Sequence, residues 1–273
     1  MSSSLFQFNT LCTQLCREHR SLRITLNRAE KENEINMETL FELESILRWA
    51  SANVEIQSLL IDSSSARFSA GLKNYQSLEA DKIIKLQEKT LSIQKLIMQC
   101  PQNVIVDYGE GADNLGIDLF LCADLRLAHR GAKFKWDYLA HGLPALGSAF
   151  VFKEIAGLNQ YKNWIFSAAT IQTQSLESCG FLANCYDSEN RQEVIEQYVE
   201  SFCSQSAGCR IQNKLNINQH LIFAFEQTLK SEFSVFQGAL YSQDWKKSAD
   251  NFTPAKEIKN AVRMTLIKNE QEA

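Results

Sequence analysis

The stretch from Gly111 to Pro144 restricts the possible folds more than any other part of the chain, because it joins several kinds of element in one run. A glycine-containing turn leads into an apolar helix, and the hexapeptide Ala-Asp-Leu-Arg-Leu-Ala follows at residues 123–128. An aromatic segment then ends in Gly-Leu-Pro. Turns, apolar helices and short apolar segments in close succession are typical of layered α/β proteins.

The first half of the chain repeats this alternation. Residues 21–27 alternate polar and apolar side chains, as a half-buried strand does, and Asn36 can cap a helix whose apolar positions recur every three or four residues. We expect further strands at 54–62 and 103–107, separated by a helix from Gly71 to about Met98. The order of these elements predicts an α/β architecture.

The last third of the chain has a different character. From about Val194 onward strand signals disappear, and apolar residues recur at helical spacing. We therefore divide the chain into a core of residues 1–195 and a helical C-terminal subdomain of residues 196–273. The apolar positions after Gln219 are numerous enough to predict self-association through these helices: Leu221, Phe225, Leu229, Phe233 and Phe236.

Composition narrows the class of protein. The 273 residues are 45% hydrophobic, which is enough for a sizeable core, and the net charge of −4 with mixed signs argues against a nucleic-acid surface or a polybasic membrane patch. No apolar run reaches the ~20 residues that a membrane span needs, and the first residues lack a signal-peptide pattern, so we expect a cytoplasmic protein. The eight cysteines are scattered and are expected to be free thiols, without a metal site.

Several short strings, in order along the chain, resemble motifs of the crotonase (enoyl-CoA hydratase/isomerase) superfamily. The first is residues 26–36, Leu-Asn-Arg-Ala-Glu-Lys-Glu-Asn-Glu-Ile-Asn, and the second is the turn Ala66–Gly71. The glycine turn before Asp124 is the third, and the segments Gly157–Phe181 and Ser242–Asp244, with Phe252 beyond, complete the series. The resemblance covers roughly residues 20 to 255, and the sequence is identified as a divergent member of this superfamily.

This resemblance implies a fold, an assembly and a ligand. The fold would be the ClpP/crotonase spiral of repeating ββα units, with two nearly perpendicular sheets and a C-terminal helical trimerisation region. The assembly would be a homotrimer or a hexamer. The ligand would be an acyl thioester of coenzyme A or of an acyl carrier protein, with no cofactor beyond the coenzyme A of the substrate.

An enolate formed beside a thioester carbonyl can be stabilised by two backbone N–H groups, the oxyanion hole. The resemblance places these donors at Leu72, after the Ala70-Gly71 pair, and at Leu115 in the glycine turn. The sequence Asn114-Leu115-Gly116 stands where the family usually has a run of glycines. A side chain at Leu115 would narrow or reshape the acyl slot, because only glycine lacks the Cβ.

Hydratases of this family use two glutamates, and here both positions differ. By counting back from Asp124, the first corresponds to Asp118, which could be catalytic, solvated or a helix cap. The second falls on Tyr138, which could act as a hydrogen-bond donor or acid, or could simply pack in the interior. Asp137, in a shifted register, and His141 are further candidates for acid-base chemistry.

The resemblance also places the nucleotide part of coenzyme A along two segments. One is the loop Ala29–Ile35, which includes Lys31 and Glu34, and the other is the turn from Ala70 to Asn74, which includes Lys73. The two lysines would supply positive charge for phosphates. Two functions remain open. The protein could be an enzyme of the lyase or isomerase class, with isomerase, decarboxylase, hydrolase or atypical hydratase chemistry, or a non-catalytic thioester-binding or assembly subunit.

Overall fold

A six-stranded sheet forms the centre of the protein, in a computed structural model that describes residues 6–16, 18, 20–145 and 148–247. The strands lie in the order β1-β2-β3-β4-β6-β9. Every neighbouring pair is parallel except the hairpin of β1 and β2. Their bounds are β1 Leu11–Cys16, β2 Ser21–Leu26, β3 Ser58–Ser63, β4 Asn103–Asp107, β6 Leu125–His129 and β9 Asn184–Tyr186.

A second, smaller sheet consists of β5 (Gly111–Asp113), β7 (Lys133–Lys135) and β8 (Thr170–Gln172). The segment Arg67–Ser69 extends this pattern, since Arg67 bridges to Gly109 and Ser69 bridges to Ala112. Strands β3 and β4 of the large sheet are therefore each followed by a short extended segment and then a helix, and β6 is followed by β7. These are the repeating ββα units that the sequence led us to expect.

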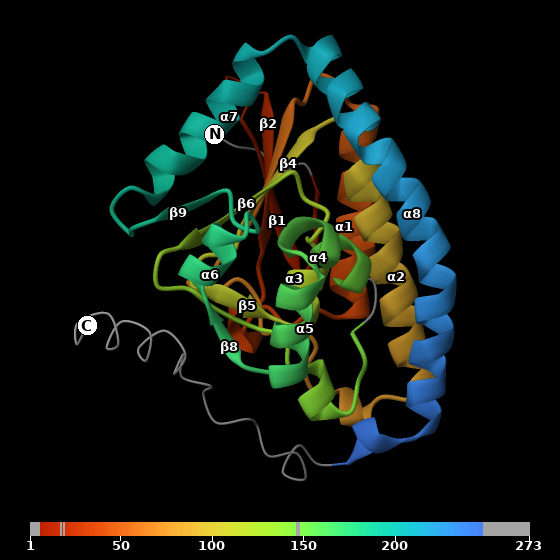
Figure 1. Ribbon diagram of the computed structural model, residues 1–273. Helices are drawn as coiled ribbons and strands as arrows, with labels where there is room; N and C mark the ends of the chain where they lie inside the picture. Colours follow the sequence, from red (N-terminus) through yellow and green to blue (C-terminus); the bar gives the residue numbers. More distant parts are fainter. Residues whose placement is uncertain (1–5, 17, 19, 146–147, 248–273) are drawn as a thin grey trace, which may run out of the picture.

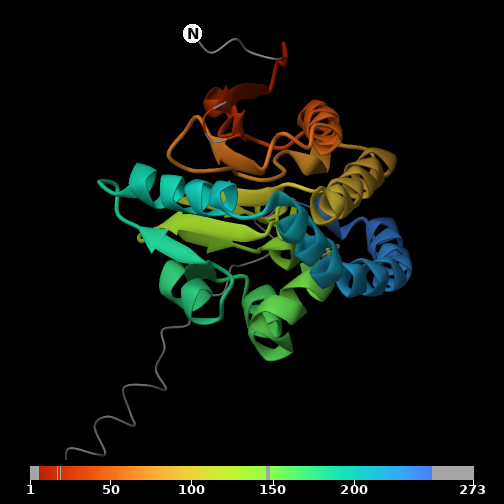
Figure 2. The same cartoon turned by 90° about the horizontal axis from the view of Figure 1, so that it is seen from above.

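Helices cover both faces of the large sheet (Figure 1). Helices α1 (Met37–Ala52), α2 (Ala80–Gln99) and α8 (Ala207–Tyr241) lie on one side, and α7 (Arg191–Ser204) lies on the other. In both views α8 runs beside α2 (Figure 2). Successive residues of β3 alternate between the two layers: Leu59 and Ile61 belong to the main core, whereas Leu60 packs with residues of α7. This double burial explains the nearly continuous apolar sequence of the strand.

Short helices complete the fold. They are α3 (Leu115–Asp118), α4 (Ser148–Ala156), α5 (Leu158–Ser167) and α6 (Thr173–Ser178), together with the 3-10 turns η1 (Ala29–Lys31), η2 (Tyr75–Ser77), η3 (Tyr138–His141) and η4 (Asp244–Lys246). Within the described ranges no helix is both long and apolar enough to cross a membrane. All eight cysteines are free.

Two element boundaries differ from the sequence prediction. Strand β3 begins at Ser58 and not at Val54, and α2 begins at Ala80 and not directly after Gly71. The second difference has a local cause, because Gly71 and Asn74 both have positive φ, at 68° and 51°, which a helix cannot accommodate. The predicted cap of α1 is confirmed, since the Asn36 side chain accepts a hydrogen bond from Thr39 N at 2.8 Å.

The apolar positions of the C-terminal helix have a different role from the one we expected. Phe225 and Phe236 are buried in the main core, and the other three predicted positions pack against it. This face of α8 therefore belongs to the protein's own interior, and using it to argue for self-association was wrong. Other apolar residues of α8 are exposed instead: Ile217, Phe223, Val235 and Tyr241.

The proposed division at residue 195 falls within α7, and α8 packs against α2 and α4 of the preceding part. Residues 248–273 of the predicted subdomain, with Phe252, lie outside the described residues. The two-part organisation stays a prediction.

Candidate functional site

The turn Phe68–Gly71 is fixed by hydrogen bonds to the loop that follows β2. Ala70 N donates to Glu32 O at 3.0 Å, and Ile35 N donates to Gly71 O at 2.8 Å. Ser69 Oγ donates to Asn33 O at 2.6 Å and accepts from Gly71 N at 3.0 Å. The structure thus brings together the two segments that the sequence placed beside coenzyme A, 29–35 and 70–74.

The same turn packs closely against the glycine turn that opens α3. A Cβ on Gly71 would lie 2.5 Å from Asp113 O and 3.2 Å from Leu115 N, so these two stretches of backbone are in direct contact. The amides of Leu72 and Leu115 donate no hydrogen bond to any other residue in the described part of the chain. Two N–H groups on adjacent segments therefore have no partner among the described residues, and an oxyanion hole would need two such donors.

The Leu115 side chain lies in the hydrophobic core, and the residue is only 1% exposed. Its bulk is thus taken up by the protein interior. Shielding from water strengthens any hydrogen bond made by this amide. The covering segments must move locally before a ligand can reach it. Gly116, the next residue, has no room for a Cβ, which would lie 2.8 Å from Ser69 Cβ.

Asn114, the residue before Leu115, is held by a reciprocal pair of hydrogen bonds. Asp137 N donates to Asn114 Oδ1 at 2.9 Å, and Asn114 Nδ2 donates to Asp137 Oδ1 at 2.5 Å. The other oxygen of Asp137 accepts from Lys135 and His141, at 2.6 and 3.3 Å. Burial raises the pKa of Asp137, but the hydrogen bonds from His141, Lys135 and Asn114 outweigh burial and hold that pKa well below its usual range. Asp137 and His141 are brought together, and Asp137 positions the turn.

Asp118 ends α3 and is buried, with 1% of its surface exposed. Its Oδ1 accepts from Trp136 Nε1 at 2.7 Å, and its Oδ2 accepts from Tyr138 Oη at 2.7 Å. The expectation of a solvated carboxylate is therefore excluded, and the Asp118 side chain caps no helix N-terminus in the described part of the chain. Gln94 Nε2 of α2 donates to the backbone oxygen of Asp118 at 2.5 Å. Asp118 and Tyr138, which the family resemblance assigned to the hydratase glutamate positions, are hydrogen-bonded to each other.

Burial raises the pKa of Asp118 to about 7, although the hydrogen bonds from Trp136 and Tyr138 act in the opposite direction. The charge of Glu232, on α8, adds to the increase. Burial and the neighbouring Asp118 raise the pKa of Tyr138 well above its ordinary value, so the phenol stays protonated and donates. The pair can hold or release one proton near neutral pH.

An aromatic cluster surrounds this pair. The ring of Trp136 contacts those of Phe152, Trp164 and Phe181, with centroid distances of 4.7, 6.3 and 5.8 Å. Sequence reasoning missed Trp136 as a partner of the carboxylate. The alternation of Phe134, Trp136 and Tyr138, all buried, was the signal that could have placed these side chains on one face.

A polar groove of about 390 Å³ lies beside the turn that contains Ala70. Four cationic side chains and two carboxylates line it: Arg67, Lys73, Lys133, Lys135, Glu32 and Asp113. Lys73 pairs with Glu32, and Lys31 lies exposed in the adjacent loop. Tyr75, just after this turn, packs edge-on against His141 at 5.6 Å, which links the groove to η3.

The chain is similar to known proteins in both sequence and fold. The family model of enoyl-CoA hydratase/isomerase matches residues 18–259. The crotonyl-CoA hydratase of Syntrophomonas wolfei is 21% identical over 86% of this chain and 92% of its own length. The 2,3-dehydroadipyl-CoA hydratase of Escherichia coli K12 is 22% identical over 81% of this chain and 87% of its own. The crystal structure of an enoyl-CoA hydratase from Bacillus halodurans superposes with a TM-score of 0.82 at 19% identity, covering 89% of this chain and all of that one.

The protein belongs to the enoyl-CoA hydratase/isomerase family and has the crotonase fold. The family and fold that the sequence indicated are confirmed.

Proposed function

We propose that the protein binds an acyl thioester and stabilises its enolate with the backbone N–H groups of Leu72 and Leu115. The observation that carries this proposal is the contact between Gly71 and the Asp113–Leu115 turn. It sets the amides of Leu72 and Leu115, which have no partner among the described residues, on adjacent segments. A thioester oxygen that accepts from both would gain most as negative charge develops on it. Relatives named as acyl-CoA hydratases support a coenzyme A thioester, and an acyl carrier protein is the other source of the same group.

Chemistry that needs one proton transfer fits this site better than two-carboxylate hydration does. Tyr138 stands in the second glutamate position, and both oxygens of Asp118 accept hydrogen bonds from neighbouring side chains. With a pKa of about 7, Asp118 could take up a proton, and Tyr138 could act as the hydrogen-bond donor beside it. Isomerisation, decarboxylation with protonation of the enolate, thioester hydrolysis and an atypical hydratase or lyase reaction remain the candidates.

The nucleotide would lie in the polar groove beside Ala70. The four cations outnumber the carboxylates even when Asp137, the partner of Lys135, is counted with Glu32 and Asp113, and this positive charge suits the phosphates of coenzyme A. Under this proposal Lys31 and Lys73 contact phosphate groups, and the backbone of Ala29, Glu34, Ile35, Ala70 and Asn74 borders the nucleotide.

A non-catalytic thioester-binding subunit is the second candidate, and one observation favours it: Asp118 is enclosed and has no unoccupied oxygen. Exchange of the α-protons of acetyl-CoA and butyryl-CoA in deuterated water separates the two candidates. Binding with exchange above the rate in buffer supports an enzyme. Binding without exchange, with each acyl-CoA tested, supports the second candidate, and no binding to any acyl-CoA or acyl carrier protein contradicts both.

A further inference from the structure

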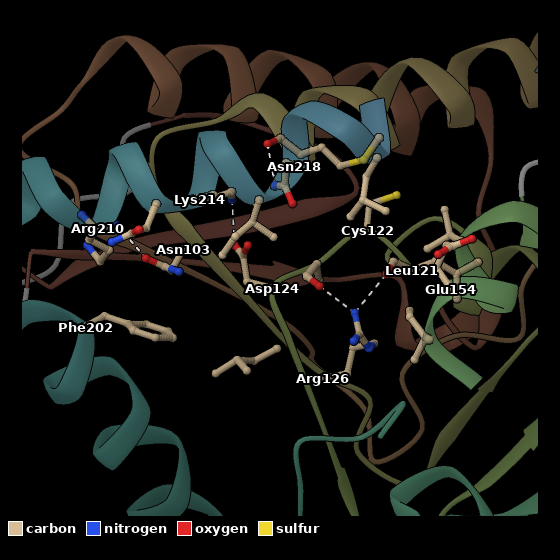
Figure 3. A pocket seen from close by; sticks show the side chains of 18 of the residues that line it. Asn103, Leu121, Cys122, Asp124, Arg126, Glu154, Phe202, Arg210, Lys214 and Asn218 are labelled. Carbon is tan, nitrogen blue, oxygen red and sulfur yellow. Dashed lines mark hydrogen bonds and ion pairs between the residues drawn. The ribbon is translucent and has the colours of Figure 1, made fainter. Parts of the chain in front are cut away.

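A second cavity, of about 470 Å³, lies between α4, α8 and the edge of the large sheet where β4 and β6 begin (Figure 3). Its wall is largely apolar and includes Leu121, Val151, Ile155, Phe202, Ile217 and Leu221. None of Leu72, Leu115, Asp118 and Tyr138 lines it. A concave, mainly apolar cavity with a few converging polar groups is the usual form of a small-molecule site.

The charges in this wall do not balance. Arg126, Arg210 and Lys214 are all more than nine-tenths buried, whereas Asp124 and the half-exposed Glu154 are the acidic residues. Lys214 Nζ pairs with Asp124 Oδ2 at 2.7 Å (Figure 3). Glu154 lies 3.4 Å from Lys153. Two buried guanidinium groups thus have no carboxylate within ion-pair distance in the described part of the chain.

The two arginines differ in how their donors are used. Arg126 donates to the backbone oxygens of Phe181, Leu121 and Ala123, at distances of 2.6 to 2.9 Å, so a structural role accounts for it. Arg210 donates from one terminal nitrogen to Asn103 Oδ1 at 2.7 Å and to Pro101 O at 3.2 Å. Arg210 Nε is buried and has no partner among the described residues.

A buried cation whose partners are all neutral is costly, and burial lowers the pKa of Arg210 accordingly. Nε and the second terminal nitrogen form one edge of a guanidinium, and this edge matches the two oxygens of a carboxylate. Nε is enclosed, so the Arg210 side chain has to turn before this edge can face a ligand in the cavity. One such edge suits a single planar anion, and the apolar wall suits an aliphatic chain attached to it.

We propose that this cavity binds a medium-chain aliphatic carboxylate, whose head group pairs with Arg210 and whose chain lies between α4 and α8. The site is separate from the thioester site and does not depend on the function proposed there.

Calorimetry with octanoate tests the proposal on the full-length protein. We expect saturable binding that strengthens about fourfold per methylene from butyrate to octanoate, and much weaker binding of octan-1-ol, which lacks the charge. Arg210→Gln should weaken octanoate binding about 10-fold or more, because a charge-assisted pair is lost. Arg48→Gln, an exposed arginine on α1, is the matched control and should leave binding unchanged.

A second variant keeps the test decisive if Arg210→Gln does not fold. Val151→Phe should fill the apolar part of the cavity and weaken octanoate more than butyrate. The proposal is overturned if the folded wild type binds no octanoate at millimolar concentration, or if both variants bind it as the wild type does. If coenzyme A displaces octanoate, octanoate binds in the thioester site, and the proposal is overturned. The proposal is also overturned if octanoate does not bind and Arg210→Gln changes the oligomeric state measured by light scattering. The occupant of the cavity would then be a second copy of the chain.

Discussion

Tyr138 Oη donates to Asp118 Oδ2 at 2.7 Å, and this hydrogen bond joins the two residues that the family resemblance assigned to the hydratase glutamate positions. A water molecule activated by two carboxylates needs free acceptor oxygens on both. Here one of the two groups is a protonated phenol, and its hydrogen is directed at the other. The Asp118 carboxylate is enclosed, and both of its oxygens accept hydrogen bonds from neighbouring side chains.

We therefore expect slow hydration of crotonyl-CoA even where the thioester binds. Loss of one positioned acid-base group costs a factor of about 10²–10⁴ in rate, and the occupied oxygens of Asp118 act in the same direction. The rate of hydration is measured spectrophotometrically as loss of the enoyl double bond, with a crotonyl-CoA hydratase assayed in parallel as the reference. A rate equal to that of the reference would contradict our interpretation of Tyr138.

Asp118→Asn should abolish any α-proton exchange and leave thioester affinity nearly unchanged. The amide can still accept from Trp136 and can donate to Tyr138 Oη, so the fold has a reason to tolerate the change. Proton NMR in deuterated water measures the exchange, and calorimetry measures the affinity. Exchange that survives in this variant would point to Asp137 or His141 as the acid-base group.

The raised pKa of Asp118 also predicts how stability depends on pH. The folded-state pKa is about 7, and the unfolded-state value is about 3.9. Between these values the folded protein binds more protons than the unfolded chain, so the contribution of Asp118 makes the protein less stable as pH rises from about 4 to 7. The full difference is on the order of 4 kcal/mol.

Urea unfolding at a series of pH values measures this contribution as the difference between the wild type and Asp118→Asn. The wild type should lose stability relative to the variant as pH rises through that window. Glu88→Gln, at an exposed position of α2, is the control and should follow the wild type. Parallel curves for the wild type and Asp118→Asn would show that the carboxyl group has an ordinary pKa.

Gly71→Ala should destabilise the protein by about 2–4 kcal/mol, because it adds a Cβ at positive φ and against Asp113 O. It should also remove thioester binding, since Leu72 and Leu115 would move apart. The Cβ added by Gly238→Ala in α8 meets no atom within 4 Å among the described residues outside its own helical turns, and the change should stabilise the protein by up to about 1 kcal/mol. Urea unfolding compares the two variants. Equal stability of both would contradict the close contact at Gly71.

The contrast between Gly71 and Asp118 shows what the sequence could and could not predict. The Ala66–Gly71 turn and the Leu115 turn lie where the family resemblance placed them, and both depend on local backbone conformation, because φ is positive at Gly71 and at Asn114. The state of Asp118 depends on Trp136, Gln94 and Glu232, which lie far from it in the chain. Burial by distant elements leaves no local pattern.

The role of the apolar face of α8 was also not predictable from local sequence. The spacing of Phe225 and Phe236 correctly indicated one apolar face, yet spacing cannot say whether that face meets the chain's own core or another copy. The structure shows that it meets the core. The pairing of Asp137 with Asn114 could not be predicted from the sequence either, because it depends on the pairing of β7 with β5 in the small sheet.

Self-association stays a prediction, and it now rests on the exposed apolar residues of α8. Ile217, Phe223 and Val235 each expose 66% of their surface, and Tyr241 exposes 84%. We expect a homotrimer or hexamer, with Phe223→Asp and Val235→Asp shifting it toward monomer, because a charge in an apolar interface is costly. Light scattering at micromolar concentration measures the mass, and Lys85→Asp on α2 is an exposed control. A monomeric wild type would contradict the prediction.

Glu32→Gln should tighten the binding of coenzyme A. Glu32 pairs with Lys73 at the rim of the polar groove and competes with phosphate for that lysine. Removing its charge is expected to raise affinity about 2- to 10-fold at low ionic strength, and salt should reduce the gain. Calorimetry with coenzyme A measures the change, and Glu30→Gln in the same loop, outside the groove lining, is the matched control. The double variant Lys31→Glu, Lys73→Glu should lose coenzyme A binding. If this variant binds coenzyme A as tightly as the wild type does, the nucleotide lies outside the polar groove.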